Sequence, residues 1–252
     1  MRDLFSVAGK TALVTGGTSG IGRMIAEGLV AGGVVTYIVG RNAETCRATA
    51  RELSAKGTCH PLVGDISTNA GIEGVVTELR QRADSLDILV NNAGAMYEAP
   101  IDEFTEEGWD SLADLNLKSV FFLTQKLLPM LRAAASEEDA ASVVNIGSVG
   151  GLRVGPKENY SYQATKAGLH HLTGSLGKRL GPENITVNAL APGFFPSRLT
   201  SPDDVTPEIL GMVPRRRMGT GDDVAGAVIY LASRAGNFVT GAVLPLDGGL
   251  TL

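Results

Sequence analysis

The amino-acid sequence predicts an α/β fold, in which a doubly wound parallel sheet of seven strands forms a single domain over residues 1–252. Two observations predict this fold. Short apolar runs rich in Val and Ile alternate with longer amphipathic stretches, which is typical of a parallel sheet covered by helices on both faces. In addition, no linker, internal repeat, low-complexity tract or run of like charges divides the chain.

The expected strands are short and flanked by Gly, Asn or Pro, whereas the expected helices are longer. Along the chain, strands are predicted at Thr11–Thr15, Val34–Val39, Thr58–Val63 (the weakest candidate), Ile88–Val90, Val143–Ile146, Ile185–Leu190 and Val243–Leu246. Helices are predicted at Ile21–Ala31, Ala43–Ala55, Ala70–Arg82, Glu106–Ala135 and Ser161–Leu180.

One segment near the C-terminus interrupts this alternation. Asp203–Gly221 has little apolar periodicity and contains the basic triplet Arg215-Arg216-Arg217. Long irregular insertions in compact domains are often lids or binding loops. We therefore expect a substrate lid around residues 195–221, with a solvated surface connection as the alternative.

Composition and charge exclude several classes of protein. Apolar residues make up 44% of the chain and charged residues 19%, which excludes a disordered or fibrous protein. The net charge of −5 argues against a nucleic-acid partner. Two cysteines and three histidines predict neither a disulfide framework nor a metal site. The sequence shows no signal peptide and no apolar window of about 18 residues, so we expect no membrane association and a cytoplasmic location.

A glycine-rich turn, TGGTSGIG, lies between the first predicted strand and the first predicted helix. Residues without a Cβ let the backbone approach a pyrophosphate, and a helix N-terminus adds unpaired N–H groups and a partial positive charge. In this position the turn predicts a Rossmann-like dinucleotide site. The expected cofactor contacts are Gly16, Thr18, Ser19, Gly20, Ile21 and Gly22.

The end of the second predicted strand indicates which dinucleotide binds. An NAD site usually has a carboxylate about 20 residues beyond the glycines, but this stretch reads Val39-Gly40-Arg41-Asn42. An arginine fork pairs well with a phosphate. We therefore expect Arg41, with Asn42 beside it, to bind NADP(H), which is favoured over NAD(H). Glu44 lies close to this position in the sequence and could supply a carboxylate, so NAD(H) is still a possible cofactor.

Tyr162 and Lys166 are spaced i,i+4 in the last predicted helix and so share one face. A free phenol titrates near pH 10, and a neighbouring ammonium together with oxidised nicotinamide would lower that pKa toward neutral pH. Tyr160 cannot take this role, because its i+4 partner is Ala164. Ser148 ends the run SVVNIGS, where its hydroxyl could hold a substrate carbonyl at the carboxyl edge of the sheet.

With these motifs the chain resembles the short-chain dehydrogenase/reductase family, in its short single-domain branch. The resemblance covers essentially the whole chain, from Lys10–Thr15 to Leu246–Gly249. It implies that Asn116 is a fourth catalytic residue, which could anchor a water in a proton relay. Family members are commonly tetramers, so a homo-oligomer is expected, with a tetramer favoured. The resemblance implies further cofactor contacts from Asp65, Ile66, Asn92, Ala93, Gly94, Tyr162, Lys166, Pro192, Gly193, Phe195 and Ser197.

Two segments, SVVNIGSVGG and NALAPGFFPSRLT, are similar to β-ketoacyl reductases associated with rhamnolipid synthesis. This similarity implies an NADP(H)-dependent oxidoreductase that interconverts a ketone and a secondary alcohol, with a 3-oxoacyl compound as the leading substrate. Substrate class drifts freely within one fold, so a reductase or dehydrogenase of a cyclic, steroid-like or terpenoid alcohol is an alternative. The candidate pocket residues fit each of these, because they are apolar: Met96, Val149, Leu152 and Phe194.

A different class of function, a non-catalytic NADP-binding sensor, is also open. Sensors that resemble the family usually lack the tyrosine or the lysine, and this chain has both Tyr162 and Lys166. A serine hydrolase is excluded in its usual form, since no serine lies in a G-x-S-x-G elbow.

Overall fold

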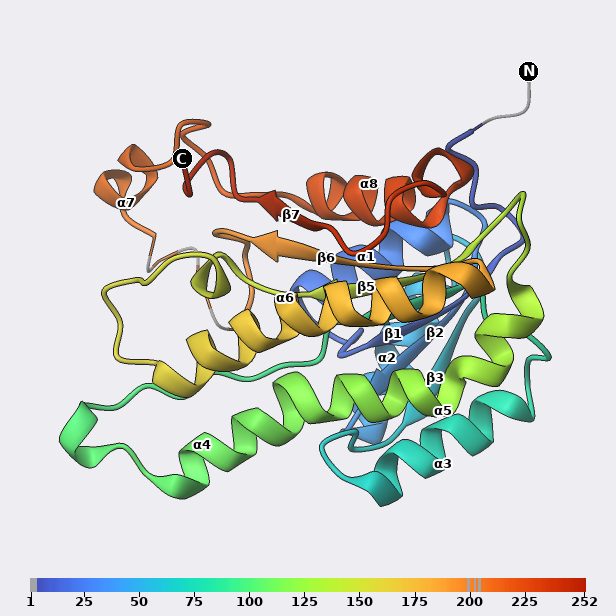
Figure 1. The fold of residues 1–252 in the computed structure, drawn as a ribbon, viewed down its shortest axis with the longest axis horizontal. Helices are drawn as coiled ribbons and strands as arrows, with labels where there is room; N and C mark the ends of the chain where they lie inside the picture. Colours follow the sequence, from blue (N-terminus) through green and yellow to red (C-terminus); the bar gives the residue numbers. More distant parts are fainter. Residues whose placement is uncertain (1–3, 199, 202, 204) are drawn as a thin grey trace.

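The structure is a computed structural model that describes residues 4–198, 200–201, 203 and 205–252. Its centre is a parallel sheet with the strand order β3-β2-β1-β4-β5-β6-β7 (Figure 1). The predicted sheet is confirmed, and each predicted strand agrees with an observed one to within two residues at either end. The strands are β1 (Thr11–Thr15), β2 (Val35–Gly40), β3 (Cys59–Val63), β4 (Ile88–Asn91), β5 (Ala141–Ile146), β6 (Ile185–Pro192) and β7 (Val243–Leu246).

Side chains that alternate along the central strands enter two separate cores, one on each face of the sheet. On β1, Leu13 packs in one core, whereas Ala12 and Val14 pack in the other. All three are fully buried. A strand that is buried on both faces needs apolar residues at successive positions, which is why β1 reads as an unbroken apolar run.

The longer helices are α1 (Gly20–Ala31), α2 (Ala43–Leu53), α3 (Asn69–Arg80), α4 (Glu106–Ala113), α5 (Ser119–Ala134), α6 (Tyr160–Leu180) and α8 (Gly221–Ala232). The short ones are α7 (Pro207–Gly211), η1 (Ile101–Glu103), η3 (Val149–Gly151), η4 (Gly181–Glu183) and η6 (Arg234–Gly236). Helices α1, α2 and α8 cover one face of the sheet, and α3, α5 and α6 cover the other (Figure 1). Within the described part of the chain, no helix has both the length and the apolar character of a membrane span.

The helix predicted over Glu106–Ala135 is confirmed as one helical stretch, but it is not α-helical throughout. A π-helical turn, η2 (Asp114–Lys118), separates α4 from α5. The apolar pattern continues through this turn, so periodicity alone could not reveal it. Turns of this type are frequent at functional sites, and this one carries Asn116.

Helix α8 lies where no helix is expected from the sequence. It begins with a capping box, in which Thr220 Oγ1 accepts from the N–H of Asp223 and the Asp223 carboxylate accepts from the N–H of Thr220. A Thr-x-x-Asp spacing before an apolar run is a known signal for a helix start. The helix was therefore predictable, and it begins at Gly221, the last residue of the expected irregular segment.

The order of the sheet places the functional motifs side by side. Strands β1 and β4 are neighbours, although β2 and β3 separate them in the sequence. In open α/β sheets, ligands bind at the carboxyl ends of the strands beside such a switch point. The glycine turn after β1 and the NNAG run after β4 meet there.

The described part of the segment predicted as a lid includes the short helix α7, whose start is capped by the hydroxyl of Thr206. Three residues of the predicted lid, Leu199, Pro202 and Asp204, lie outside the described residues. Beyond α7, the Arg217 guanidinium forms an ion pair with Asp223 at 2.6 Å, which ties the segment to the start of α8.

Candidate active site

A cavity of about 970 Å³ lies at the carboxyl ends of the central strands. Its wall includes every residue predicted to bind the cofactor, from Gly16 in the glycine turn to Ser197 beyond β6. Ser148 and Lys166 line the same cavity, as does the partly exposed Tyr162. The tertiary structure thus brings together motifs that are spread over most of the chain.

The glycine turn forms a close-packed cradle. A Cβ on Gly22 would collide with the side-chain amide of Asn92 and with the carbonyl oxygen of Gly16. Gly16 and Gly20 have positive φ angles of 64° and 51°, which glycine adopts without strain. Helix α1 begins after Ser19, whose side chain makes no capping hydrogen bond. The first N–H groups of α1 are therefore available to an anion such as a pyrophosphate.

Arg41 and Asp65 follow the neighbouring strands β2 and β3 at one end of the cavity. Burial acts to raise the pKa of Asp65, but hydrogen bonds from Ser67 and the charge of Arg41 outweigh it and hold this pKa below its usual value. Asn42 also lines the cavity, and its Oδ1 accepts from the N–H of Thr45 at 2.9 Å. This bond caps α2 and places the Arg41–Asn42 pair at the cavity wall.

The residue before Arg41 has no room for a side chain. A Cβ on Gly40 would lie 2.6 Å from Cγ2 of Thr18. An NAD site usually has a carboxylate at about this position. Because Thr18 packs against Gly40, no side chain stands before Arg41, and Arg41 is the basic residue at this end of the cavity, near Asn42 and Asp65.

The loop after β4 is attached to β1 by a small network of hydrogen bonds. Thr15 Oγ1 accepts from the N–H groups of Asn92 and Ala93 at 2.9 and 3.0 Å. The Asn92 side chain donates in turn to the Thr15 carbonyl oxygen at 2.8 Å. This network holds Asn92, Ala93 and Gly94 at the cavity wall, as the family resemblance implies.

Ser148 and Tyr162 meet inside the cavity. Ser148 Oγ accepts from the N–H of Gly150 at 3.0 Å, which orients the hydroxyl at the start of η3. Burial raises the pKa of the Tyr162 phenol, and a hydrogen bond with the Ser148 side chain offsets this only in part. The expected lowering of the phenol pKa is therefore not achieved by the protein's own groups.

Lys166 lies beside the tyrosine, as the i,i+4 spacing predicts. Its Nζ is 5.8 Å from the centroid of the Tyr162 ring and donates to the Ile146 carbonyl oxygen at 2.7 Å. Burial lowers the pKa of Lys166 to about 8. The amine therefore gives up its proton more readily than a lysine in water.

Asn116 does not line the cavity; it lies behind the wall and is buried. Its Oδ1 accepts from the N–H of Ala95 and its Nδ2 donates to the Ala95 carbonyl oxygen, both at 3.0 Å. Nδ2 also donates to Oγ1 of Thr165 at 3.4 Å. A Cβ on Gly94 would lie 3.2 Å from Asn116 Oδ1 and 3.6 Å from Lys166 Nζ, so these two side chains flank Gly94.

The segment after β6 contributes to both ends of the cavity. Ser197 lies beside the glycine turn, because a Cβ on Gly20 would be 3.0 Å from Ser197 Cβ. Phe195 lines the cavity but is 3% exposed, and its ring packs where a Cβ on Gly219 would collide with it. Pro192, the last residue of β6, and Gly193, which follows it, also line the cavity.

One supporting residue has no motif in the sequence. His170 lies one turn after Lys166 on α6, and its Nε2 accepts from the N–H of Ser148 at 3.4 Å. A Cβ on Gly147 would collide with this imidazole ring. The ring therefore packs directly beneath the backbone that carries Ser148.

The substrate end of the cavity is mainly apolar. Met96, Val149 and Phe194 line it, as predicted, whereas the predicted Leu152 does not and is 42% exposed. Leu152 caps the end of η3 and lies outside the cavity wall, although the next residue, Arg153, is part of it. Val205 and Ile209 of the predicted lid also line the cavity, and so do Arg153 and Leu250, which the sequence analysis did not predict.

Comparison with known proteins identifies the family. A family model described as enoyl-(acyl carrier protein) reductase matches residues 16–251. The chain is also 44% identical, over 256 residues and the full length of both proteins, to the rhamnolipids biosynthesis 3-oxoacyl-[acyl-carrier-protein] reductase of Pseudomonas aeruginosa. The chain is a short-chain dehydrogenase/reductase.

Other short-chain dehydrogenases/reductases agree with this assignment. Gluconate 5-dehydrogenase of Gluconobacter oxydans is 34% identical, with 99% of this chain and 98% of that protein covered. The solved RhlG/NADP active-site complex of Pseudomonas aeruginosa superposes with a TM-score of 0.95 at 43% identity and covers 100% of both chains. The protein is therefore an oxidoreductase that acts on CH–OH groups with NAD(P) as acceptor, which confirms the function class predicted from the sequence.

Proposed function

We propose that this protein is an NADP(H)-dependent 3-oxoacyl reductase, which converts the 3-ketone of an acyl substrate to the secondary alcohol. The observation that carries the proposal is the meeting of Ser148, Tyr162 and Lys166 at one cavity beside the glycine cradle. The substrate class draws on the name of the relative from Pseudomonas aeruginosa. It is also supported by the apolar side chains at the substrate end of the cavity.

In this proposal Tyr162 is the proton donor. Since burial raises its pKa, the phenol keeps its proton at neutral pH and can pass it to the carbonyl oxygen of the substrate. Ser148 Oγ donates a hydrogen bond to the same oxygen and holds it in place. The chemistry that a reduced dinucleotide supplies when bound is the hydride for the carbonyl carbon.

Lys166 returns the proton to Tyr162. Its lowered pKa of about 8 makes it a ready donor near neutral pH, and its amine lies on the same face of α6 as the phenol. Asn116 keeps the surrounding wall in place through its bonds to Ala95 and, in the proposed relay, anchors a water that returns protons from solvent.

We also propose that NADP(H) is preferred over NAD(H). The uncapped start of α1 and the close packing at Gly22 fit a pyrophosphate. Arg41 offers a fork for a 2′-phosphate, while Gly40 leaves no space for the carboxylate that a ribose diol would need.

A panel of carbonyl compounds tests the proposed function. The purified protein is mixed with NADPH and 3-oxoacyl thioesters, cyclic ketones or steroid ketones, and the loss of NADPH absorbance is followed. We expect the fastest turnover with 3-oxoacyl thioesters. Turnover of cyclic ketones alone would show that the substrate belongs to the cyclic class. Binding of NADPH without any turnover would favour a non-catalytic sensor.

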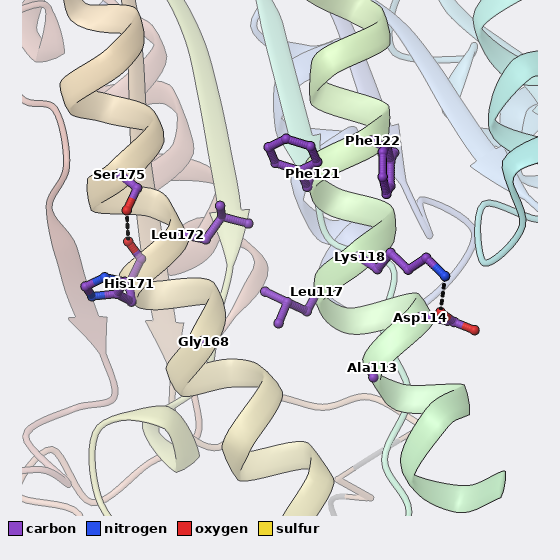
Figure 2. Close-up of a pocket in the computed structure, with 10 residues that line it drawn as sticks. All are labelled: Ala113, Asp114, Leu117, Lys118, Phe121, Phe122, Gly168, His171, Leu172 and Ser175. Atoms are coloured by element: carbon purple, nitrogen blue, oxygen red, sulfur yellow. Dashed lines mark hydrogen bonds and ion pairs between the residues drawn. The ribbon is translucent and has the colours of Figure 1, made fainter.

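We propose further that the chain forms a homo-oligomer, with a tetramer favoured. An apolar groove of about 500 Å³ runs between α5 and α6, where Leu117, Phe121 and Leu172 face one another (Figure 2). On a different surface, Leu244 on the edge strand β7 and the nearby Phe238 are exposed. A tetramer with two-fold symmetry axes needs two different self-complementary surfaces. Analytical ultracentrifugation tests this, and a particle with the mass of one chain would contradict it.

A cytoplasmic location is the last part of the proposal. Cys46 and Cys59 are free, buried thiols, and burial raises the pKa of each. Free thiols are typical of reducing compartments. Cell fractionation tests the location, and recovery of the protein outside the cytoplasmic fraction would contradict it.

A further inference from the structure

Arg153 is a cation at the substrate end of the cavity that the proposed chemistry does not use. It lies between η3 and α6, and its backbone N–H donates to the carbonyl oxygen of Val149 at 3.0 Å. Val149 directly follows Ser148. Arg153 is therefore held within one turn of the hydroxyl proposed to bind the substrate carbonyl, and both residues line the same cavity.

The C-terminal segment holds the guanidinium in place. Nη1 of Arg153 donates to the carbonyl oxygen of Leu250 at 2.7 Å, and Leu250 is itself a buried part of the cavity wall. The Asp247 carboxylate organises this segment by accepting from the N–H groups of Gly249 and Thr251, each at 2.8 Å. A guanidinium has five N–H donors in a planar fork. One bond to Leu250 leaves the others for a ligand.

The charge of Arg153 has no ion-pair partner in the part of the chain that the structure describes. Lys157 on the same loop differs, because its Nζ pairs with Glu98 at 3.2 Å. Arg153 is exposed and lines the same cavity as the apolar side chains of Met96 and Phe194, so its guanidinium can bind a negative group on a substrate that enters with an apolar chain.

Arg153 and Arg41 lie at different ends of the cavity. Arg41 follows β2 and Arg153 lies beyond β5, and these strands are three places apart in the sheet. With neighbouring strands about 4.8 Å apart, this separation is roughly 14 Å. A cofactor phosphate at Arg41 therefore leaves Arg153 free for the substrate.

We propose that Arg153 binds an anionic group of the substrate and thereby sets which substrates the enzyme accepts. The carbonyl then lies at Ser148 and the anion at the C-terminal segment. A phosphate on the carrier arm of a thioester and a free carboxylate share this chemistry. The inference rests on the proposed function only in placing the carbonyl at Ser148.

Binding of unreactive saturated acyl ligands tests this proposal without turnover. Three ligands of equal chain length are used: a neutral N-acetylcysteamine thioester, a phosphopantetheine thioester and the free fatty acid. Their affinities for the protein loaded with NADP⁺ are measured by calorimetry. We expect at least one anionic ligand to bind the wild type about 10-fold or more tightly than the neutral one. The anionic ligand that binds more tightly than the neutral one shows whether Arg153 recognises a phosphate or a carboxylate.

Substitutions of Arg153 distinguish an effect of its charge on ligand binding from an effect of its packing. Arg153→Gln keeps a donor for the Leu250 carbonyl but should abolish the preference for the anion, whereas Arg153→Lys should keep most of it. Arg51→Gln, on the exposed surface of α2, makes the same change in net charge and should have no effect. A preference that survives in Arg153→Gln would overturn the proposal, as would its absence from the wild type. Equal weakening of neutral and anionic ligands would assign Arg153 a packing role only.

A parallel assay keeps this inference separate from the proposed function. Reduction of the neutral 3-oxoacyl N-acetylcysteamine thioester by the wild type supports the proposed function whatever Arg153 does. If no 3-oxoacyl compound is reduced but charge-selective binding is present, the proposed function fails and the role of Arg153 stands.

Discussion

The side-chain amine of Lys166 donates a hydrogen bond to the carbonyl oxygen of Ile146, the last residue of β5, at 2.7 Å. Ser148 follows Ile146 by two residues. One stretch of backbone therefore positions both the lysine and the serine of the proposed site. Lys166 as a residue is 5% exposed, and burial lowers the pKa of its amine to about 8.

The buried amine of Lys166 predicts a pH-dependent effect on stability. Below about pH 8 the lysine is charged in the folded and the unfolded chain, and burying that charge destabilises the wild type. Between about pH 8 and pH 10.5 the unfolded chain binds a proton that the folded chain does not, so stability rises with pH. From pH 7 to pH 10 the wild type should gain roughly 2 to 3 kcal/mol relative to Lys166→Met.

Urea unfolding of both proteins at pH 7 and pH 10 measures this gain. Lys178→Met, an exposed position on the same helix, is the matched control and should differ from the wild type equally at both pH values. An equal difference for Lys166→Met at both pH values would show that the amine is hydrated.

Tyr162→Phe should lower kcat by about 100-fold or more, because general acid catalysis is typically worth that much. The affinity for NADPH, measured by fluorescence titration, should stay near that of the wild type. Tyr160→Phe is the matched control: Tyr160 is exposed and donates to Glu158, and this variant should keep its activity. If Tyr162→Phe turns over within a few-fold of the wild type, Tyr162 is not the proton donor.

Arg41→Asp should change the cofactor preference. Losing a charge-assisted bond and adding a like charge should raise the KM for NADPH about 10-fold or more, while the KM for NADH changes little. Steady-state kinetics with both cofactors measures the two effects. Arg47→Asp, exposed on α2 and away from the cavity, should leave both values unchanged. Equal increases for both cofactors in Arg41→Asp would place the 2′-phosphate elsewhere.

Gly22→Ala should abolish dinucleotide binding and lower the melting temperature, because the added methyl group collides with the backbone of Gly16. Gly74→Ala, in α3, provides the contrast: a Cβ there meets nothing within 4 Å, and the change should stabilise the helix by about 0.5 to 1 kcal/mol. Thermal unfolding and NADPH titration measure both effects. Tight NADPH binding by Gly22→Ala would show that the turn can relax.

Local patterns were enough to predict much of the fold and of the candidate site. The strands, the glycine turn and the spacing of Tyr162 and Lys166 depend on residues that are close in sequence, so their periodicity and order are visible there. The sequence signal for the start of α8 is equally local, because its capping box needs only Thr220 and Asp223. The π-helical turn at Asn116 could not be predicted in this way, because it leaves the apolar pattern of the sequence unchanged.

The sequence by itself determined the family, the parallel sheet and the motifs that supply the predicted cofactor contacts of the cavity. Only the tertiary structure decided what those groups do to one another. Lys166 meets a carbonyl 20 residues away, and Arg153 meets one 97 residues away. Burial raises the pKa of Tyr162, whereas the neighbouring lysine together with oxidised nicotinamide was expected to lower it. Desolvation and contacts of this kind depend on which residues pack around a group in three dimensions. The residues next to the group in the sequence do not show which residues these are.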